Sequence, residues 1–479
     1  MMSKTKSTDS LPALDRSKRT PLSRQVYERF RAAIEQGTLR PGDRVASARS
    51  LASELGVARG TVEAAYGQLA GEGYFSSRGQ AGTVVSPSLP QHRPTRREPR
   101  RAGTTTAPAG ALAPAAAPLP LQLGIPALDA FPRKLWARLA NRRIRATGAA
   151  DMFYGDPAGH PPLREAIAAY LLVSRGVACH PSQVFVTGGY RASLSLASRT
   201  LLKKGDRVWT EEPGFPPTQD VLHAAGHRAV RVPVDDEGMV VARGQRKAAK
   251  ARMAIVTPSH QAPLGVSMTL ARRLQLLAWA SQANAWIVED DYDGEYRYAG
   301  PPLPALKSLD GHDRVLYAGS FSKVLHPGLS LGYLVVPESL RARFQEAAQT
   351  WSNGCPQITQ AITADFMREG HFSRHLKKMR LLYARRRAML VAALQKAFGD
   401  AVRIDLQSGG MHLIARFDGR SETDVELARR AQEVGLQCQP LSERGGAGVR
   451  SQGLLMGFTN VASAAQAQQL VATLRAALG

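Results

Sequence analysis

The sequence AGSFSKVLHPG, at residues 318–328, places Lys323 directly after a short hydrophobic run. Two hydroxyl side chains, Ser320 and Ser322, stand between this run and the lysine. Small residues and hydroxyls at such a point suit the binding of an anion close to the lysine ammonium group. A lysine without these neighbours would most simply be an exposed helix residue, but its surroundings favour a ligand-binding role.

Short hydrophobic runs alternate with amphipathic helical patterns around Lys323, from about residue 121 to the end of the chain. Such alternation predicts an α/β fold built on a mostly parallel sheet. In sheets of this type, ligands bind just beyond the carboxyl ends of the strands. The residues of interest therefore follow the runs QVFVTGG, RVWTEEP, RAVRVPV, MAIVTP, AWIVEDDYD, RVLYAGS and LGYLVVP.

An acidic residue, Asp290, ends another of these runs, in the sequence IVEDDYDGEY at residues 287–296. Carboxylates at strand ends are commonly only caps, but an aspartate combined with a strand-end lysine is what a pyridoxal phosphate site requires. The lysine forms a Schiff base with the aldehyde, and the carboxylate keeps the ring nitrogen protonated so that the ring accepts electrons. Asp290 and Lys323 therefore predict a site for pyridoxal 5'-phosphate.

Two further motifs supply the other parts of such a site. The sequence VTGGYRASLSL, at residues 186–196, predicts a strand, a glycine turn and a helix start. Backbone N–H groups and the helix dipole at a helix start can hold a phosphate group. In the sequence EEPGF, Phe215 is placed to cover the cofactor ring as an aromatic lid.

The charge of the chain indicates a polyanionic partner. The chain holds 63 Lys and Arg residues against 39 Asp and Glu, a net charge of +24. The first 120 residues hold 18 basic and 9 acidic side chains, and basic surfaces of this kind attract nucleic acid. Three distant cysteines exclude a disulfide scaffold and lack metal-ligand spacing, and no apolar run is long enough for a membrane span. We therefore expect a cytoplasmic protein without a metal or a membrane partner.

The composition divides the chain into two modules and a spacer. Residues 87–120 are rich in Pro, Ala and Arg and cannot form a core, so they predict a linker. The basic cluster at residues 93–101 is explained equally well by contact with DNA phosphates or by solubility. We expect a flexible tail at residues 1–19, a small module at 20–86 and a large module at 121–479.

The small module predicts three short helices followed by a β-hairpin. Apolar residues recur every four positions from Leu22 to Ile34, and a second helical pattern follows Ser47 and ends at Gly56. A third pattern opens at Thr61, so that two short helices are joined by a tight turn, as in a helix-turn-helix. The sequence YFSSRGQAGTVV then predicts a two-stranded wing.

Residues 21–85 resemble the winged helix-turn-helix domain of GntR-type bacterial regulators, which bind double-stranded DNA. One departure is Ala58, where the family usually has a serine, and the loss of this helix cap costs roughly 1 kcal/mol. Taken singly, each arginine of this module is more often an exposed helix residue than a DNA contact. The resemblance implies that five residues face the DNA: Arg49, Arg59, Thr61, Arg78 and Gly82.

The large module resembles fold-type I pyridoxal phosphate proteins of the class I aminotransferase kind. The motifs YGDPAGHPPLREAIAAYL, VTGGYRASLSL, EEPGF, TPSHQAPLG, VEDDYDGEY and GSFSKVLHPGLSLGYLV occur in the order of that family. With the small module, the whole chain resembles the MocR-type subfamily of bacterial regulators, except for the tail and the linker. The fold class implied is a small α+β winged helix-turn-helix domain plus a large α/β aminotransferase-like domain.

The resemblance assigns roles to individual residues of the large module. Lys323 would carry the cofactor as its internal aldimine, Asp290 would pair with the pyridine nitrogen, and Tyr292 would contact the phenolic oxygen. Tyr154 would reach the phosphate from the neighbouring subunit of a homodimer, and Phe215 would stack on the ring. The phosphate would be surrounded by Gly189, Tyr190, Arg191, Ser320 and Ser322.

Two departures from the family lie where phosphate and substrate would bind. Ser330 stands in the sequence PGLSLGY, where the family usually has an arginine that contacts the phosphate. The loss of a charge-assisted contact weakens binding by roughly 1.5–3 kcal/mol, and Arg191 is placed to compensate. The carboxylate-binding arginine of aminotransferases is matched by Ser451, with Arg450 one residue away. Arg450 is therefore the candidate for an effector carboxylate, although an exposed loop arginine explains it somewhat better.

Three functions are compatible with these features. The first is a DNA-binding transcription regulator that senses pyridoxal phosphate or an amino compound that reacts with it. The second is a working aminotransferase with an accessory DNA-binding head, which the missing carboxylate arginine disfavours. The third is a regulator whose body has lost the cofactor and serves only for dimerisation, which Ser330 favours. The intact Lys323 and Asp290, the head and the charge favour the first, so we expect a regulator and not an enzyme.

Overall fold

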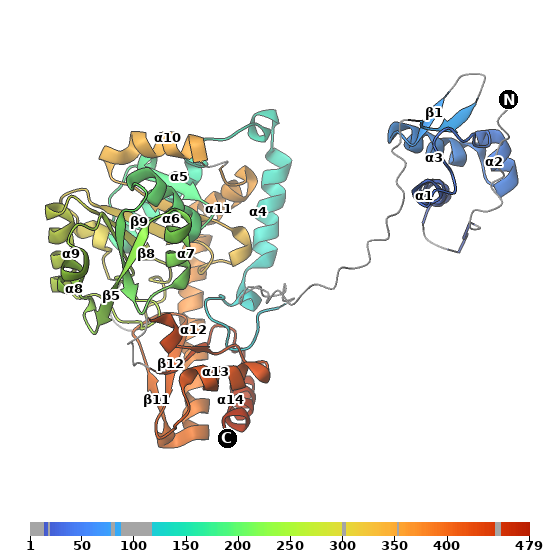
Figure 1. Cartoon of the computed structure of the whole chain (residues 1–479). Coiled ribbons are helices and arrows are strands. Elements are labelled where there is room, and N and C mark those ends of the chain that lie inside the picture. The colour runs from blue at the N-terminus through green and yellow to red at the C-terminus, as the bar shows by residue number, and fades with distance from the viewer. Residues whose placement is uncertain are drawn as a thin grey trace. The chain divides into compact units, whose positions relative to one another are not determined.

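The chain divides into two compact units, Met1–Leu112 and Ala113–Gly479. Figure 1 shows the small unit in blue and the large unit in colours from cyan to red. Each unit has a hydrophobic core of its own. The structure is a computed structural model that describes residues 14–17, 20–77, 82–87, 117–298, 303–351, 354–445 and 452–479.

The described residues of the first unit form three helices and a hairpin. These elements are α1 (Leu22–Glu35), α2 (Ala48–Leu55), α3 (Arg59–Gly71), β1 (Phe75–Ser77) and β2 (Thr83–Val85). Their core contains the rings of Phe30, Tyr66 and Phe75, which meet edge to face with centroids 5.1 to 5.5 Å apart. Strands β1 and β2 pair antiparallel. The structure confirms the predicted helix-turn-helix with its wing.

Local sequence sets the ends of the two short helices. Ser47 caps α2, where its side chain accepts a backbone hydrogen bond at 3.1 Å. Gly56 ends α2 in the left-handed conformation, with a φ of 61° that glycine adopts without strain. Helix α3 begins at Arg59, two residues before the predicted start at Thr61, because the extended N-cap is Ala58. Ala58 supplies no side-chain cap, in agreement with the departure seen in the sequence.

The second unit is built on a large mixed sheet. Its strands are β3 (Val184–Thr187), β4 (Arg207–Glu212), β5 (Arg228–Asp235), β6 (Gly238–Met239), β7 (Met253–Val256), β8 (Trp286–Asp291), β9 (Val315–Ser320) and β10 (Gly332–Val335). Their order is β3-β10-β9-β8-β7-β4-β5-β6. Strands β9, β8, β7, β4 and β5 run parallel, whereas β10 pairs antiparallel with β3 and β9. This order confirms the predicted α/β fold with a mostly parallel sheet.

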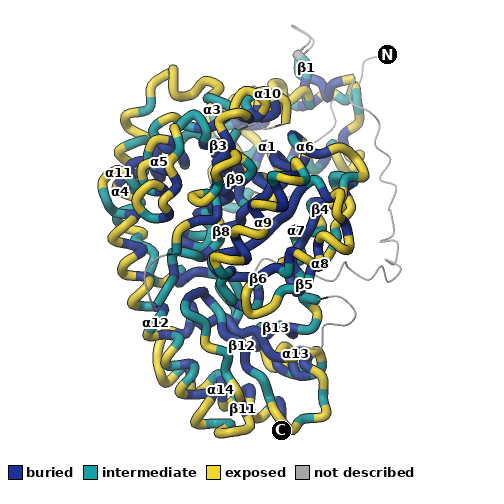
Figure 2. The backbone as a smooth tube through the Cα atoms, turned by 90° about the vertical axis from the view of Figure 1, so that its left-hand side faces the viewer, coloured by how far each residue is buried: buried dark blue, intermediate teal, exposed yellow. Residues whose placement is uncertain are grey.

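Helices cover this sheet. They are α4 (Arg133–Ala146), α5 (Pro161–Arg175), α6 (Tyr190–Leu201), α7 (Pro216–Ala224), α8 (Val241–Ala248), α9 (Leu270–Gln282), α10 (Arg341–Trp351) and α11 (Gln357–Arg368). Strands β3, β7 and β10 are buried along their whole length, as expected for a sheet that is covered on both faces. Figure 2 shows the largely buried strands β3, β8 and β9 among helices whose outer sides are exposed.

A second, smaller sheet follows in the same unit. Its strands are β11 (Val402–Asp405), β12 (His412–Phe417), β13 (Gln439–Pro440) and β14 (Leu454–Gly457), in the antiparallel order β11-β12-β14-β13. The accompanying helices are α12 (His371–Phe398), α13 (Asp424–Glu433) and α14 (Ala464–Leu478). Helix α12 packs against α14. In the part of the chain that the structure describes, no helix combines the length and the apolar character needed to cross a bilayer.

Candidate functional site

A cavity of about 460 Å³ opens at the carboxyl ends of the central strands of the large sheet. A volume of this size suits a small-molecule ligand. The small sheet contributes His412, Gln439 and Leu455 to its wall. The cavity brings together nine residues that the sequence singled out: Lys323, Asp290, Tyr292, Gly189, Tyr190, Arg191, Phe215, Ser320 and Ser322.

Lys323 lies three residues beyond the end of β9. Its ammonium Nζ donates a hydrogen bond to the carbonyl oxygen of Gly124 at 2.7 Å. The backbone carbonyl of Lys323 accepts a hydrogen bond from the Tyr296 hydroxyl at 3.2 Å, which helps to fix this turn. Burial lowers the pKa of Lys323, and the nearby Asp293 and Asp290 oppose this effect. The lowered pKa increases the fraction of neutral amine, the form that acts as a nucleophile.

Asp290 is the next to last residue of β8, and its side chain lines the same cavity. The residue is 6% exposed, and among the described residues its carboxyl makes no hydrogen bond or ion pair. Burial raises the pKa of Asp290 well above its ordinary value, and Asp291 adds to this effect. A buried carboxyl without a partner is costly. The protonated ring nitrogen of pyridoxal phosphate is a donor that would satisfy it.

The hydroxyl of Tyr292 is positioned by a histidine. Nδ1 of His260, a residue of the TPSHQ motif, lies 3.0 Å from the Tyr292 hydroxyl oxygen. The same nitrogen lies 3.2 Å from Oδ1 of Asp293. Burial, followed by Asp293, raises the pKa of Tyr292 well above its ordinary value. Tyr292 is therefore protonated at neutral pH and able to donate a hydrogen bond to a ligand oxygen.

The N-terminus of α6 forms one end of the cavity. Gly189 is its N-cap and has a φ of 99°, a conformation that side chains other than glycine rarely adopt. The backbone N–H groups of the first helical turn lack partners within the helix and can bind an anion. Arg191 lies in this turn and forms an exposed ion pair with Asp220, with 3.6 Å between the charged atoms. This end of the cavity is suited to a phosphate group.

Ser330 lies at the same end of the cavity. It follows a 3₁₀ helix (Pro327–Leu329) and has a φ of 47°, in the left-handed region. Its hydroxyl donates a hydrogen bond to the carbonyl oxygen of Gly188 at 3.3 Å. The departure from the family sequence thus falls where the phosphate would lie, and the serine brings no charge to that place.

Sequence analysis missed the residues that the small sheet adds to the cavity. His412 and Gln439 begin β12 and β13, and Arg444 ends a 3₁₀ turn (Ser442–Arg444). The Arg444 guanidinium donates a hydrogen bond to the side-chain oxygen of Gln439 and forms no ion pair among the described residues. Burial lowers its pKa. No local motif indicates these contacts, because the pairing of distant strands creates them.

Two of the predicted residues are not placed in the cavity. Tyr154 is 93% exposed on the surface of the single chain, next to the exposed Met152 and Phe153. Its expected contact requires a second subunit and stays a prediction. Arg450 lies outside the described residues, so its expected contact with an effector carboxylate also stays a prediction.

The residues expected to face DNA lie on the helix-turn-helix. Arg49 is exposed in the first turn of α2. Arg59 is the first residue of α3, and its exposed side chain forms an ion pair with Glu63 at 2.7 Å. Thr61 lies in the same turn of α3 and is half-buried. These positions leave the arginine side chains accessible to a ligand in solvent.

A further basic residue, Arg44, contacts the wing and was not singled out from the sequence. Gly82 precedes β2 with a φ of 87°, and the Arg44 guanidinium lies against it, 3.2 Å from where a Cβ atom would be. Arg44 also forms a β-bridge with Val84. Arg78 and the basic cluster at residues 93–101 lie outside the described residues.

Comparisons with known proteins match both units. The family "Aminotransferase class I and II" matches residues 121–450, and "Bacterial regulatory proteins, gntR family" matches residues 22–85. The probable rhizopine catabolism regulatory protein MocR of Rhizobium meliloti is 39% identical over 456 residues, which cover 94% of this chain and 92% of that protein. This chain belongs to the MocR-type regulators of the GntR family. Its family, its fold class and its function as a transcription regulator are as predicted from the sequence.

This MocR-type regulator is also similar to a second regulator and to a solved aminotransferase structure. The pyridoxine biosynthesis transcriptional regulator PdxR of Corynebacterium glutamicum is 33% identical over 455 residues, which cover 93% of this chain and 94% of that protein. The solved structure of LysN, an α-aminoadipate aminotransferase from Thermus thermophilus, has a TM-score of 0.67 and 28% identity. The match covers 75% of this chain and 92% of the LysN chain. In that structure, LysN is complexed with N-(5'-phosphopyridoxyl)-L-leucine. The fold of the regulator thus supports pyridoxal phosphate as its cofactor.

Proposed function

We propose that this MocR-type regulator binds pyridoxal phosphate in the cavity around Lys323 and senses an anionic amino compound that reacts there. The observation that carries the proposal is the presence, in one cavity, of a lysine amine, the unpaired buried carboxyl of Asp290 and the N-terminus of α6. These groups would hold the aldehyde, the ring nitrogen and the phosphate of the cofactor. When bound, the cofactor supplies an electrophilic carbon to which a primary amine adds.

The residues of the chain prepare the cavity for this chemistry. With the cofactor bound, Asp290 would keep the ring nitrogen protonated, and Tyr292 would donate a hydrogen bond to the oxygen atom attached to the ring. Phe215 is 42% exposed, its ring centroid lies 5.8 Å from that of Tyr190, and it would cover the face of the cofactor ring. Ser320 accepts a hydrogen bond from the backbone N–H of Ser322 at 3.2 Å, which orders the turn before the lysine.

Arg444 is our candidate for recognition of the anionic group of the effector. Its guanidinium lines the cavity without a carboxylate partner, while its backbone carbonyl accepts a hydrogen bond from the Gly214 N–H at 3.0 Å. Gln439 accepts from Arg444 through its side-chain oxygen, so its NH₂ group can donate to the same ligand. A carboxylate, sulfonate or phosphonate matches these donors.

The effector hypothesis is tested with the purified full chain and pyridoxal phosphate. A visible absorption band should appear on titration with the cofactor, and an effector should change both this band and the mobility of a complex with promoter DNA. The promoter beside the regulator's own gene is the first DNA to use in gel-shift titrations. The absence of any band at saturating cofactor would leave a regulator whose body has lost its cofactor.

A working aminotransferase is the second candidate, because solved structures of this fold, such as LysN, are aminotransferases. We expect slow or absent turnover, since Ser451 stands where aminotransferases bind the substrate carboxylate. A steady-state assay with common amino and keto acids measures this directly. Turnover at about 1 per second or faster would favour the enzyme, because that is the ordinary enzyme range.

We also infer a cytoplasmic homodimer bound to double-stranded DNA. The exposed Met152, Phe153 and Tyr154 support dimerisation, because three large apolar or aromatic side chains in a row are costly to leave in water. Tyr154 would then reach the phosphate end of the partner's cavity. Two heads in one dimer would bind two half-sites on the DNA.

Arg59→Ala is expected to weaken specific DNA binding by about five- to a hundredfold, as one lost base contact does. Arg59 is exposed at the start of α3, where Glu63 is its one ion-pair partner among the residues that the structure describes. Gel-shift titrations with the promoter and with random DNA measure the effect, which should be larger for the promoter. Arg31→Ala is the matched control, because Arg31 forms the same kind of exposed pair, with Glu35 at 2.7 Å, in α1. Equal effects of the two substitutions would contradict the assignment.

Ser330→Arg is expected to tighten the binding of pyridoxal phosphate by about ten- to a hundredfold, through one charge-assisted hydrogen bond. Ser330 already has a left-handed backbone conformation. Since serine is not glycine, its replacement by another residue with a side chain adds no new backbone strain. Titration of the visible absorption band gives the affinity. Ser330→Gln, which adds length without charge, should leave the affinity close to that of the wild type. Unchanged affinity in Ser330→Arg would place the phosphate elsewhere.

A further inference from the structure

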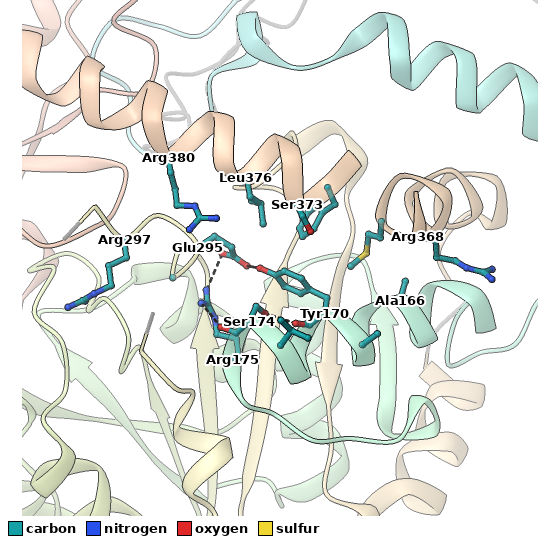
Figure 3. A pocket seen from close by; sticks show the side chains of 15 residues that line it. Ala166, Tyr170, Ser174, Arg175, Glu295, Arg297, Arg368, Ser373, Leu376 and Arg380 are labelled. Atoms are coloured by element: carbon teal, nitrogen blue, oxygen red, sulfur yellow. Dashed lines mark hydrogen bonds and ion pairs between the residues drawn. The ribbon is translucent and has the colours of Figure 1, made fainter. Parts of the chain in front are cut away.

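A second cavity, of about 570 Å³, lies between α5 and α12, and we call it the α5–α12 cavity (Figure 3). None of its lining residues lines the cavity around Lys323. Helix α5 and helix α12 each contribute one face, at the three- and four-residue spacing of neighbours on a helix. The apolar lining consists of Ala166, Ala169, Val173, Met367, Phe372 and Leu376.

The base of the α5–α12 cavity is a buried charge network. The Arg175 side chain is 4% exposed, and its Nε donates a hydrogen bond to Asp291 at 2.6 Å. Its NH2 nitrogen lies 3.6 Å from Oε2 of Glu295, and neither of these two atoms has a hydrogen-bond partner among the described residues. Tyr170 donates a hydrogen bond to the other oxygen of Glu295 at 3.3 Å. The NH2 nitrogen of Arg175 is therefore a buried donor at the base of the cavity without a hydrogen-bond partner among the described residues.

The rim of the cavity carries an excess of positive charge. Arg380 and Arg368 line it and make no hydrogen bond or ion pair among the described residues. Figure 3 shows Arg380 extending from α12 toward Glu295, whereas Arg368 points away from the centre. Burial raises the pKa of Glu295, and Arg175 opposes this effect. The lining holds four arginines, Arg175, Arg297, Arg368 and Arg380, against the one carboxylate of Glu295, so the charge that faces a ligand is positive.

We propose that the α5–α12 cavity binds a small amphipathic carboxylate, separately from the cofactor and effector cavity. Its anionic group pairs with the exposed Arg380, and the positive charge of Arg175 at the base of the cavity adds to the attraction. Its apolar body lies against Phe372 and Leu376, which are buried on the same face of α12. This combination of a cationic rim and an apolar lining excludes cations and favours a short fatty acid over a fully polar anion.

Isothermal titration of the full chain, saturated with pyridoxal phosphate, tests the proposal with octanoate as the probe. Octanoate should bind saturably, and octylamine, which has the same tail and the opposite charge, should bind at least tenfold more weakly. Absence of saturable octanoate binding up to about 10 mM, where even millimolar sites are filled, would overturn the proposal. Octylamine binding as tight as that of octanoate would do the same.

Four variants locate the binding. Arg380→Glu and Val173→Glu, both at exposed positions of the cavity, should each weaken octanoate binding at least tenfold. Lys377→Glu is the matched control, since Lys377 is exposed on α12 but does not line the cavity, and it should change binding less than twofold. Arg444→Gln should have no effect on octanoate binding. Loss of binding in Arg444→Gln, or wild-type binding in both cavity variants, would move the site out of the α5–α12 cavity.

Discussion

Lys323→Gln is expected to abolish the covalent attachment of pyridoxal phosphate completely. Lys323 is the one lysine among the described residues that line the cavity, so no second amine can replace it. The absorption spectrum of the full chain with added cofactor should show a visible band in the wild type and none in the variant. After borohydride reduction and proteolysis of the wild type, the cofactor should be found on the peptide that contains Lys323.

Lys307 provides an internal control for this labelling. Like Lys323 it is a half-buried lysine, and burial lowers its pKa as it does for Lys323. Its Nζ, however, donates a hydrogen bond to the backbone carbonyl of Val315 at 2.7 Å, and it does not line the cavity. A lowered pKa alone should therefore not attract the cofactor. Label on Lys307, or undiminished label in Lys323→Gln, would refute the site.

Arg175→Met is expected to destabilise the second unit by about 3–5 kcal/mol, as the loss of one partner from a buried ion pair does. Burial alone would lower the pKa of Arg175, but Asp291 and Glu295 outweigh it and raise that pKa. The substitution leaves both buried carboxyls without their counter-charge. Urea unfolding followed by tryptophan fluorescence measures the effect on this unit alone, because all five tryptophans lie beyond residue 121.

Two comparisons separate the charge from the packing of Arg175. Arg429→Met removes an exposed arginine that pairs with Glu426 and Glu433, and it should change stability little. A triple variant that combines Arg175→Met with Asp291→Asn and Glu295→Gln removes the three charges of this network and should recover part of the loss. If Arg175→Met unfolds at the wild-type urea concentration, the network does not stabilise the unit.

The large sheet forms the first wall of the cavity around Lys323. This wall was predictable because parallel strands end at the same edge of a sheet. Lys323, Asp290 and the glycine turn before α6 each follow a hydrophobic run, and strand-end placement brings them together whatever the order of the strands. The head was predictable for a different reason. Its helices are short, and local residues such as Ser47 and Gly56 set the ends of α2, so little depends on distant contacts.

The small sheet forms the second wall of this cavity, and this wall was not predictable from local sequence. His412 and Arg444 reach the cavity because β12 and β13 both pair with β14, and periodicity does not reveal which strands pair. Gly124 contacts Lys323 across 199 positions of the sequence, and no motif marks it. Tyr154 depends on a second chain, which the pattern of a single sequence does not describe.

The two walls of the cavity around Lys323 belong to different sheets, and the gap between them sets the length of a ligand that contacts both. Lys323 follows a strand of the large sheet, whereas Arg444 follows β13 of the small sheet. A compound whose amine reacts at the first wall and whose anion pairs at the second must match the gap between them. Among amino acids of equal charge, the number of methylene groups between amine and anion then decides which one connects both walls. Under the proposed function, the cavity would therefore select its effector by the distance between the amine and the anionic group.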